Sequence, residues 1–189
     1  MTMLFGFQKA TFRVLIATLL FTSLAGCSLL EIKKQAEFAD TLATIHGRVL
    51  KLIGDGADTP GKIVQTTHED FRAAGLSNAK ARYVRNLAEH VLDGSLPVNS
   101  LHELSDDEII ESLIQVKGIG RWSAQMFLMF RLGRPDVLPE LDLGIQKGIQ
   151  KAYRMRKLPT PKQVLRRGAK WAPYRTIGSW YMWRILEVE

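Results

Sequence analysis

Short segments whose hydrophobic residues recur every three or four positions make up most of this chain, and this spacing is typical of helices that bury one face. Three sets of residues keep the spacing: Leu42, Ile45, Val49 and Leu52; Val84, Leu87, Ala88, Val91 and Leu92; and Ile109, Ile110, Leu113 and Ile114. Alternation of polar and apolar residues, which would indicate strands, is scarce. The pattern therefore predicts an all-α fold.

Residues that cap helices indicate where these segments begin and end. Ser105 with Glu108, and Thr160 with Gln163, have the spacing of a capping box, and Pro161 suits a first helical position. The other expected starts and stops are Thr67, Gly75, Ser77, Asp93-Gly94 and Gly133. These positions predict, among others, a helix over Thr41–Ile53, one over Arg121–Leu132 and a last one that starts near Pro173.

The composition narrows the class of protein. The chain has 189 residues, 46% of them hydrophobic, which suits one compact domain and excludes a disordered or multi-span protein. A net charge of +7, with Lys and Arg spread over Arg72–Arg85 and Arg154–Arg175, favours a polyanionic partner such as nucleic acid or a membrane surface. A solvated surface is the alternative. The single cysteine, Cys27, excludes an intrachain disulfide and a four-cysteine iron–sulfur cluster.

Residues 1–30 differ in kind from the rest of the chain. Lys9 and Arg13 precede an apolar run over residues 14–26, which is the pattern of a secretory signal and is short for a transmembrane helix. Leu24-Ala-Gly-Cys27 resembles a bacterial lipobox, and this would make Cys27 a lipidated residue. We therefore expect a signal-like segment over residues 1–30 and a folded body over residues 31–189.

The segment Leu113–Met126 carries the strongest functional pattern. Gly118 and Gly120 flank Ile119 between two predicted helices, so the chain turns sharply and leaves bare N–H groups at the start of the second helix. Such a helix start suits a phosphate. Asp142 follows as a carboxylate in a proline-rich loop. The combination indicates chemistry on nucleic acid, although a helix–turn–helix segment alone is also consistent with simple packing.

These residues resemble the helix-hairpin-helix DNA glycosylase superfamily, and in particular its DNA-3-methyladenine glycosylase II branch. The resemblance lies in Val116–Arg131, Arg134–Gly144, Trp171–Arg175 and Trp180–Trp183, and it extends from about Thr44 to Arg184. It implies a compact all-α glycosylase domain over residues 31–189. We expect the N-terminal part of this domain to be truncated or altered, since Gln35–Phe38 stands where the family has a Gln-Gln-Leu-Ser-like stretch.

The resemblance implies that Asp142 is the catalytic carboxylate. An acid beside the sugar stabilises the oxocarbenium-like transition state and can orient or deprotonate a water. Asp142 is also a good N-cap for a helix over Leu143–Lys147, and the two roles are compatible. Asp136 and Glu140 are nearby acids that we favour far less as the base.

The resemblance also assigns a pocket for the flipped base. Trp122 and Trp183 match positions that line it, with Tyr174 and Trp180 as neighbouring candidates, because aromatic faces attract a cationic base. Aromatic residues at helical spacing also occur in ordinary cores. Trp122 stands where bifunctional relatives have a nucleophilic lysine, which predicts a monofunctional enzyme.

The remaining implied residues form the DNA anchor: Lys117, Gly118, Ile119, Gly120, Arg121 and Ser123. In the family the backbone carbonyls of this turn also hold a monovalent cation, and Val116 and Ile119 match two such positions. No organic cofactor is expected.

The sequence thus predicts a monomeric DNA glycosylase that removes alkylated bases, 3-methyladenine and related N-methylpurines, from double-stranded DNA in the cytoplasm. Two alternatives stay open: a non-catalytic remnant that binds DNA or other anionic polymers, and an exported lipoprotein anchored to the membrane through Cys27.

Overall fold

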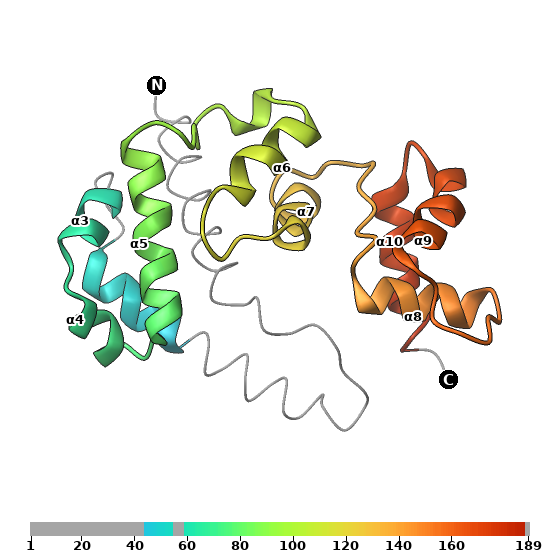
Figure 1. Ribbon diagram of the computed structural model, residues 1–189, viewed down its shortest axis with the longest axis horizontal. Coiled ribbons are helices and arrows are strands. Elements are labelled where there is room, and N and C mark those ends of the chain that lie inside the picture. Colours follow the sequence, from blue (N-terminus) through green and yellow to red (C-terminus); the bar gives the residue numbers. More distant parts are fainter. Residues whose placement is uncertain (1–43, 55–58, 188–189) are drawn as a thin grey trace. The chain divides into compact units, whose positions relative to one another are not determined.

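The computed structural model describes residues 44–54 and 59–187, and its regular secondary structure in these ranges is helical, without strands (Figure 1). The all-α prediction is therefore confirmed. No helix within the described residues is long and apolar enough to cross a membrane. The predictions on residues 1–30, including Cys27, and on Gln35–Phe38 lie outside the described residues.

The described residues form two compact units, one that ends at Ser123 and one that begins at Ala124. In the N-terminal unit, residues 44–53 are helical. They are followed by α3 (Thr59–Gln65), α4 (His68–Ala73), α5 (Asn78–Leu92), a 3-10 turn (Leu101–Glu103) and α6 (Asp106–Ile114). Helix α7 (Arg121–Phe130) begins in this unit and continues into the next.

The predicted caps define these helices. Ser105 and Glu108 form a complete capping box at the start of α6, and Ser77 caps α5 by accepting a hydrogen bond from the Lys80 N–H. Thr67 caps α4 through the Asp70 N–H, although no reciprocal bond from Asp70 to the cap backbone completes a box there. Helix α7 ends at Phe130, two residues earlier than predicted.

The core of the N-terminal unit lies between α5 and the helices that pack on it, α3 and α4. Val84, Leu87 and Ala88 of α5 are completely buried, as the spacing predicted. Three residues of the predicted apolar faces are exposed instead: Leu52, Leu92 and Ile114 are 40%, 56% and 47% exposed. Each lies in the last turn of its helix.

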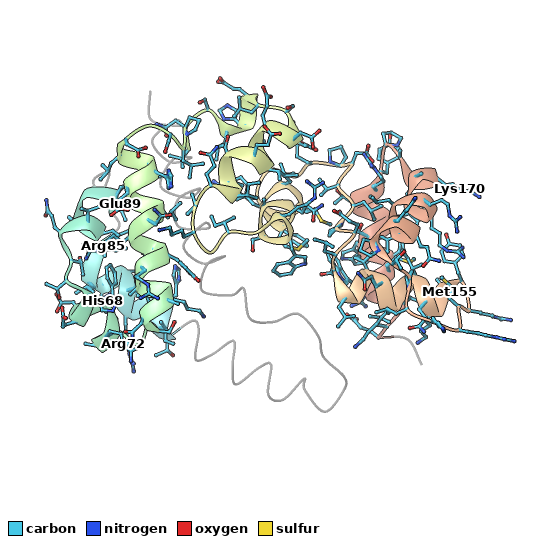
Figure 2. All side chains as sticks on the ribbon, in the orientation of Figure 1. His68, Arg72, Arg85, Glu89, Met155 and Lys170 are labelled. Carbon is cyan, nitrogen blue, oxygen red and sulfur yellow. The ribbon has the colours of Figure 1, made fainter. Side chains whose placement is uncertain are left out.

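The predicted positive face over Arg72–Arg85 is partly used for folding. Arg85 of α5 donates to the Thr66 carbonyl at 2.5 Å and to the Val64 carbonyl at 3.3 Å, which satisfies the open end of α3 (Figure 2). Arg72 donates to the Leu76 carbonyl at 2.5 Å. Both guanidinium groups thus bind backbone carbonyls of the protein itself, so they help to hold the fold together.

The C-terminal unit contains α8 (Leu143–Ala152), α9 (Pro161–Gly168), a 3-10 turn (Ala169–Trp171) and α10 (Arg175–Arg184). Thr160 and Gln163 form the predicted capping box of α9, with Pro161 in its first turn. Helix α10 begins two residues after Pro173, because the Tyr174 N–H is still bonded to the Trp171 carbonyl at 2.7 Å in the preceding turn.

Helices α8 and α10 pack closely in this unit. Leu138, Ile145, Ile149 and Val164 form the buried cluster, with Met155, Trp171, Met182 and Trp183 packed against it. At the crossing, a Cβ on Gly148 would lie 2.1 Å from the Met182 carbonyl oxygen, so only glycine permits this approach. The close packing places α10 beside the first turn of α8, where Asp142 lies.

Candidate functional site

The turn between α6 and α7 forms a candidate site in the N-terminal unit. Its amides close a tight loop: the Val116 N–H donates to Leu113 and the Ile119 N–H donates to the Val116 carbonyl at 3.0 Å. Val116 and Ile119 are buried and anchor the turn. Gly118 has a φ of +89°, which L side chains rarely adopt, so the sharp turn requires glycine here.

Two residues of α5 that the sequence pattern did not single out hold this turn. A Cβ on Gly118 would lie 2.4 Å from Cδ2 of the Tyr83 ring, so the ring packs directly on the glycine backbone. The Asn86 Oδ1 accepts a hydrogen bond from the Lys117 N–H at 2.8 Å. Tyr83 and Asn86 are three positions apart and therefore share one face of α5. The turn is fixed before any ligand arrives.

The outer side of the turn is open. Lys117, Gly118, Gly120 and Arg121 are exposed, and a Cβ built on Gly120 would meet no atom within 4 Å. The missing side chain at Gly120 therefore leaves the backbone accessible at the start of α7, where the N–H groups have no partner within the helix. Ser123 is buried, as is Ile119, so these two residues of the predicted anchor do not form part of the open outer side.

Asp142 forms a separate candidate site, in the C-terminal unit. It is the N-cap of α8, as predicted, and its Oδ1 accepts a hydrogen bond from the Ile145 N–H at 2.7 Å. The same oxygen accepts a second hydrogen bond from the Trp183 Nε1 of α10 at 2.9 Å. The residue is 7% exposed. Two donors from two helices therefore fix the orientation of a nearly buried carboxylate.

The contact between Asp142 and Trp183 depends on Gly144. A Cβ on this residue would lie 2.7 Å from Cδ1 of Trp183 and 3.0 Å from Oδ1 of Asp142. On its other side the half-buried Trp183 indole stacks with the ring of Phe130, with centroids 6.0 Å apart and planes at 26°. Phe130 was not among the residues found from the sequence, since it looked like one more apolar position of α7.

The other two acids of this loop are bound elsewhere. Asp136 accepts two hydrogen bonds from the Arg175 side chain, at 2.6 and 2.8 Å, and these bonds hold the pKa of the Asp136 carboxyl below its usual value. Glu140 is buried and accepts a hydrogen bond from Gln125 Nε2 at 2.9 Å. Both interactions fasten the loop that presents Asp142.

The remaining pocket candidates are placed as follows. Trp122 lies in the first turn of α7, in the N-terminal unit, and is half-buried. Tyr174 directly precedes α10 and is 60% exposed, and Trp180 of α10 is 49% exposed. Among the predicted site residues, Asp142 and Trp183 are thus joined by a hydrogen bond, and Val116–Ser123 lie together in one turn.

Metal ligands of the usual kind are not gathered in the described parts of either unit: no group of three or more His, Cys, Asp and Glu side chains there could hold a metal ion. The turn offers backbone carbonyls instead. The Val116 carbonyl accepts one bond from the Ile119 N–H, and a carbonyl oxygen has a second lone pair for another partner.

The chain belongs to the HhH-GPD superfamily of base excision DNA repair proteins, whose family model matches residues 32–174. Among curated proteins it is 41% identical over 127 residues to DNA-3-methyladenine glycosylase 1 of Schizosaccharomyces pombe, a match that covers 67% of this chain and 56% of the relative. It is 33% identical over 128 residues to a putative DNA-3-methyladenine glycosylase of Bacillus subtilis, covering 68% of this chain and 45% of that protein. The chain thus spans about half the length of these relatives.

Two solved structures share the fold. One is the 3-methyladenine DNA glycosylase of S. pombe in complex with abasic DNA, with a TM-score of 0.74 and 32% identity over 92% of this chain and 79% of that one. The other is a DNA-3-methyladenine glycosidase from Bacillus halodurans, with a TM-score of 0.76 and 34% identity over 94% and 76% of the two chains. The helix-hairpin-helix resemblance in the sequence is thereby confirmed.

Proposed function

We propose that this protein is a monofunctional DNA glycosylase that flips alkylated bases out of duplex DNA and removes them by hydrolysis. The observation that carries the proposal is the oriented, nearly buried carboxylate of Asp142, held by the Ile145 N–H and the Trp183 indole. The similarity to proteins named as 3-methyladenine DNA glycosylases supports the same reaction and substrate class.

In the proposed reaction, Asp142 faces the sugar of the flipped nucleotide. As the bond to the base breaks, positive charge develops on the sugar, and a fixed carboxylate stabilises it without having to reorganise. The carboxylate also orients a water molecule for attack on the sugar carbon. An N-methylated purine already carries a positive charge, so it leaves as a neutral base and needs no strong acid. One carboxylate is sufficient for this chemistry.

The aromatic residues would select the substrate. Trp183 and Tyr174 of the C-terminal unit, and Trp122 of the N-terminal unit, are each proposed to contact the flipped base, because a cationic base is attracted to the faces of such rings. Trp183 has its N–H committed to Asp142. It would therefore contribute to the pocket through its ring and not through hydrogen bonding to the base.

The turn over residues 117–123 would hold the DNA strand. Exposed amides at the start of α7 would bind a backbone phosphate, and Lys117 and Arg121 would add positive charge beside them. We further propose that the carbonyls of Val116 and Ile119 bind a monovalent cation, which would lend its charge to this phosphate contact. This anchor reads shape and charge and not base sequence.

The decisive experiment incubates the full chain with methylated duplex DNA and measures the free base released under single-turnover conditions. Asp142→Asn keeps the helix cap but loses the negative charge, and we expect the rate to fall by about 10²-fold or more. Asp107→Asn, at an exposed position of α6, makes the same chemical change away from the site and should leave the rate unchanged. Equal rates for the protein and Asp142→Asn would refute the proposed role of Asp142.

Another measurement tests whether the reaction is monofunctional. Borohydride should trap no covalent adduct between the protein and DNA, because the second position after Gly120 is Trp122 and not lysine. An adduct would contradict the monofunctional reaction.

We also propose that the protein acts as a monomer in the cytoplasm, where chromosomal DNA lies. Intact-mass analysis of the protein made in a bacterial host, together with its size in solution, tests this location and state. Cleavage before Cys27 with added lipid would favour the anchored alternative.

A further inference from the structure

Positive charge is concentrated in one part of the chain. Residues 143–186 contain eleven Lys and Arg residues and no Asp or Glu, whereas the whole chain contains 26 basic and 19 acidic residues. The rest of the chain therefore has more acidic than basic residues. An even positive surface for solubility would not be distributed in this way, and the segment needs a specific explanation.

A hollow in the C-terminal unit gathers part of this charge. It has a volume of about 290 Å³ and is lined by Tyr153, Arg166, Arg167 and Lys170. Tyr153 follows the last residue of α8, and Arg166 and Arg167 lie in the last turn of α9. Lys170 lies in the 3-10 turn that follows α9, and it points outward from the C-terminal helices (Figure 2).

The cations of this hollow are held in place but are not neutralised. The Arg167 guanidinium lies over the Tyr153 ring, 4.6 Å from its centroid, and this contact limits the motion of the side chain. In the described ranges, none of Arg166, Arg167 and Lys170 forms an ion pair, and Arg167 Nε is buried there without a hydrogen-bond partner. Like charges placed together repel each other, and an anion would relieve this repulsion.

The charge continues along α9. A second hollow, of about 360 Å³, is lined by Thr160, Lys162, Gln163 and Arg166, so the two hollows share Arg166. Lys162 and Arg166 are four positions apart and lie on one face of the helix, about 6 Å apart along its axis. A row of cations of this length suits a chain of phosphate groups better than a single small anion.

The residue types favour phosphate. Arginine presents several N–H groups in a planar fork that matches phosphate oxygens, and lysine adds a mobile point charge. The exposed Tyr153 offers a ring and a hydroxyl beside them. Among the described residues, the charged side chains that line both hollows are all cations, so this surface suits an anion.

We infer that this surface, formed by Lys162, Arg166, Arg167 and Lys170 with Tyr153 and here named the α9 basic surface, is a second nucleic-acid contact that binds backbone phosphates. It rests on the proposed function insofar as duplex DNA is the polymer that the turn over residues 117–123 also binds. Its role is to increase affinity, while the base is removed elsewhere.

The test compares two triple variants of the full chain. Arg166→Gln, Arg167→Gln and Lys170→Gln together remove three charges from the α9 basic surface. Arg48→Gln, Lys51→Gln and Lys62→Gln remove three exposed charges from helices of the N-terminal unit, so both variants have the same net charge. Fluorescence anisotropy then gives the dissociation constant for methylated and undamaged duplex DNA at several salt concentrations.

We expect the α9 triple variant to bind both duplexes about tenfold more weakly at moderate salt. The slope of log K against log salt should fall by about 0.9 for each phosphate contact that is lost, whereas the control variant keeps the original slope. Base release by the α9 variant under saturating DNA should equal that of the unmodified protein. Because Arg167 packs on Tyr153, the double variant Arg166→Gln with Lys170→Gln repeats the measurement without disturbing that contact.

Each outcome separates this inference from the proposed function. The inference is overturned if both triple variants bind DNA equally more weakly, or if the α9 variants bind DNA as tightly as the unmodified protein, even when base release is normal. The inference is supported if only the α9 variants bind DNA more weakly and with a smaller dependence of log K on log salt. This holds even if the unmodified protein releases no base and the proposed function fails. No measurable DNA affinity in the unmodified protein overturns both.

Discussion

The hydrogen bond between Trp183 and Asp142 gives the sharpest test of the site. Trp183→Phe keeps an aromatic ring against Phe130 but removes the Nε1 donor, which lies 2.9 Å from Asp142 Oδ1. The Ile145 N–H still donates to the same oxygen at 2.7 Å, so the carboxylate loses one of these two donors and keeps its role as the helix cap. The perturbation therefore acts mainly on the orientation of the carboxylate.

The size of the effect follows from this geometry. A hydrogen bond to a charged group contributes about 1.5–3 kcal/mol, which corresponds to about 10- to 150-fold in rate if all of it acts in the transition state. Since Ile145 continues to restrain Asp142, we expect an effect at the lower end of this range, a release of base that is about tenfold slower.

The assay is single-turnover release of methylated base at saturating DNA, with Tyr181→Phe as the matched control. Tyr181 lies on the same helix and is 59% exposed, and its substitution removes a polar group but keeps the ring beside Trp180, so it should change the rate by less than about twofold. In an Asp142→Asn background, Trp183→Phe should have a much smaller effect, because the two changes remove one interaction. A rate for Trp183→Phe equal to that of Tyr181→Phe, or a full tenfold effect of Trp183→Phe without the carboxylate, would refute the reasoning.

Two further predictions concern the turn and the loop. Gly118→Ala should lower the free energy of unfolding by more than about 1–2 kcal/mol, since it combines a positive φ with a clash against Tyr83. Gly120→Ala should leave thermal stability unchanged but weaken DNA binding. A Gly118→Ala protein as stable as the unmodified one would contradict this. The ion pair with Arg175 lowers the pKa of Asp136, so its contribution to stability is present above the ordinary Asp pKa and is lost as pH falls through the lowered one. Chemical denaturation should therefore show Asp136→Asn less stable than the unmodified protein at neutral pH, with the gap closing in acid, and a gap that does not depend on pH would exclude this origin.

Local features of the fold could be predicted from the sequence because they depend on neighbouring residues. The capping boxes at Ser105 and Thr160 join residues three positions apart, and both are present in the structure. The exposure of Leu92 and Ile114 could not be predicted, because burial depends on tertiary packing and not only on the spacing within one helix. Helical spacing identifies a face but not the length of that face that is covered.

The site shows the same division between local and long-range information. Asp142 as a helix cap follows from its neighbours, but its bond to Trp183 joins residues 41 positions apart in the sequence. Tyr83 and Asn86 were missed because nothing near them in the sequence relates them to Gly118 and Lys117. Their contacts arise from the packing of α5 beside the turn.

The double use of Asp142 limits how this protein can change over generations. Replacing this residue by alanine would remove a helix cap, with a loss of about 0.5–2 kcal/mol, as well as the carboxylate. Asparagine, serine and threonine are alternatives that retain a capping oxygen. If the activity were lost during evolution, few substitutions of Asp142 would keep α8 stable. An aspartate conserved at this position would therefore reflect selection for folding as much as selection for repair.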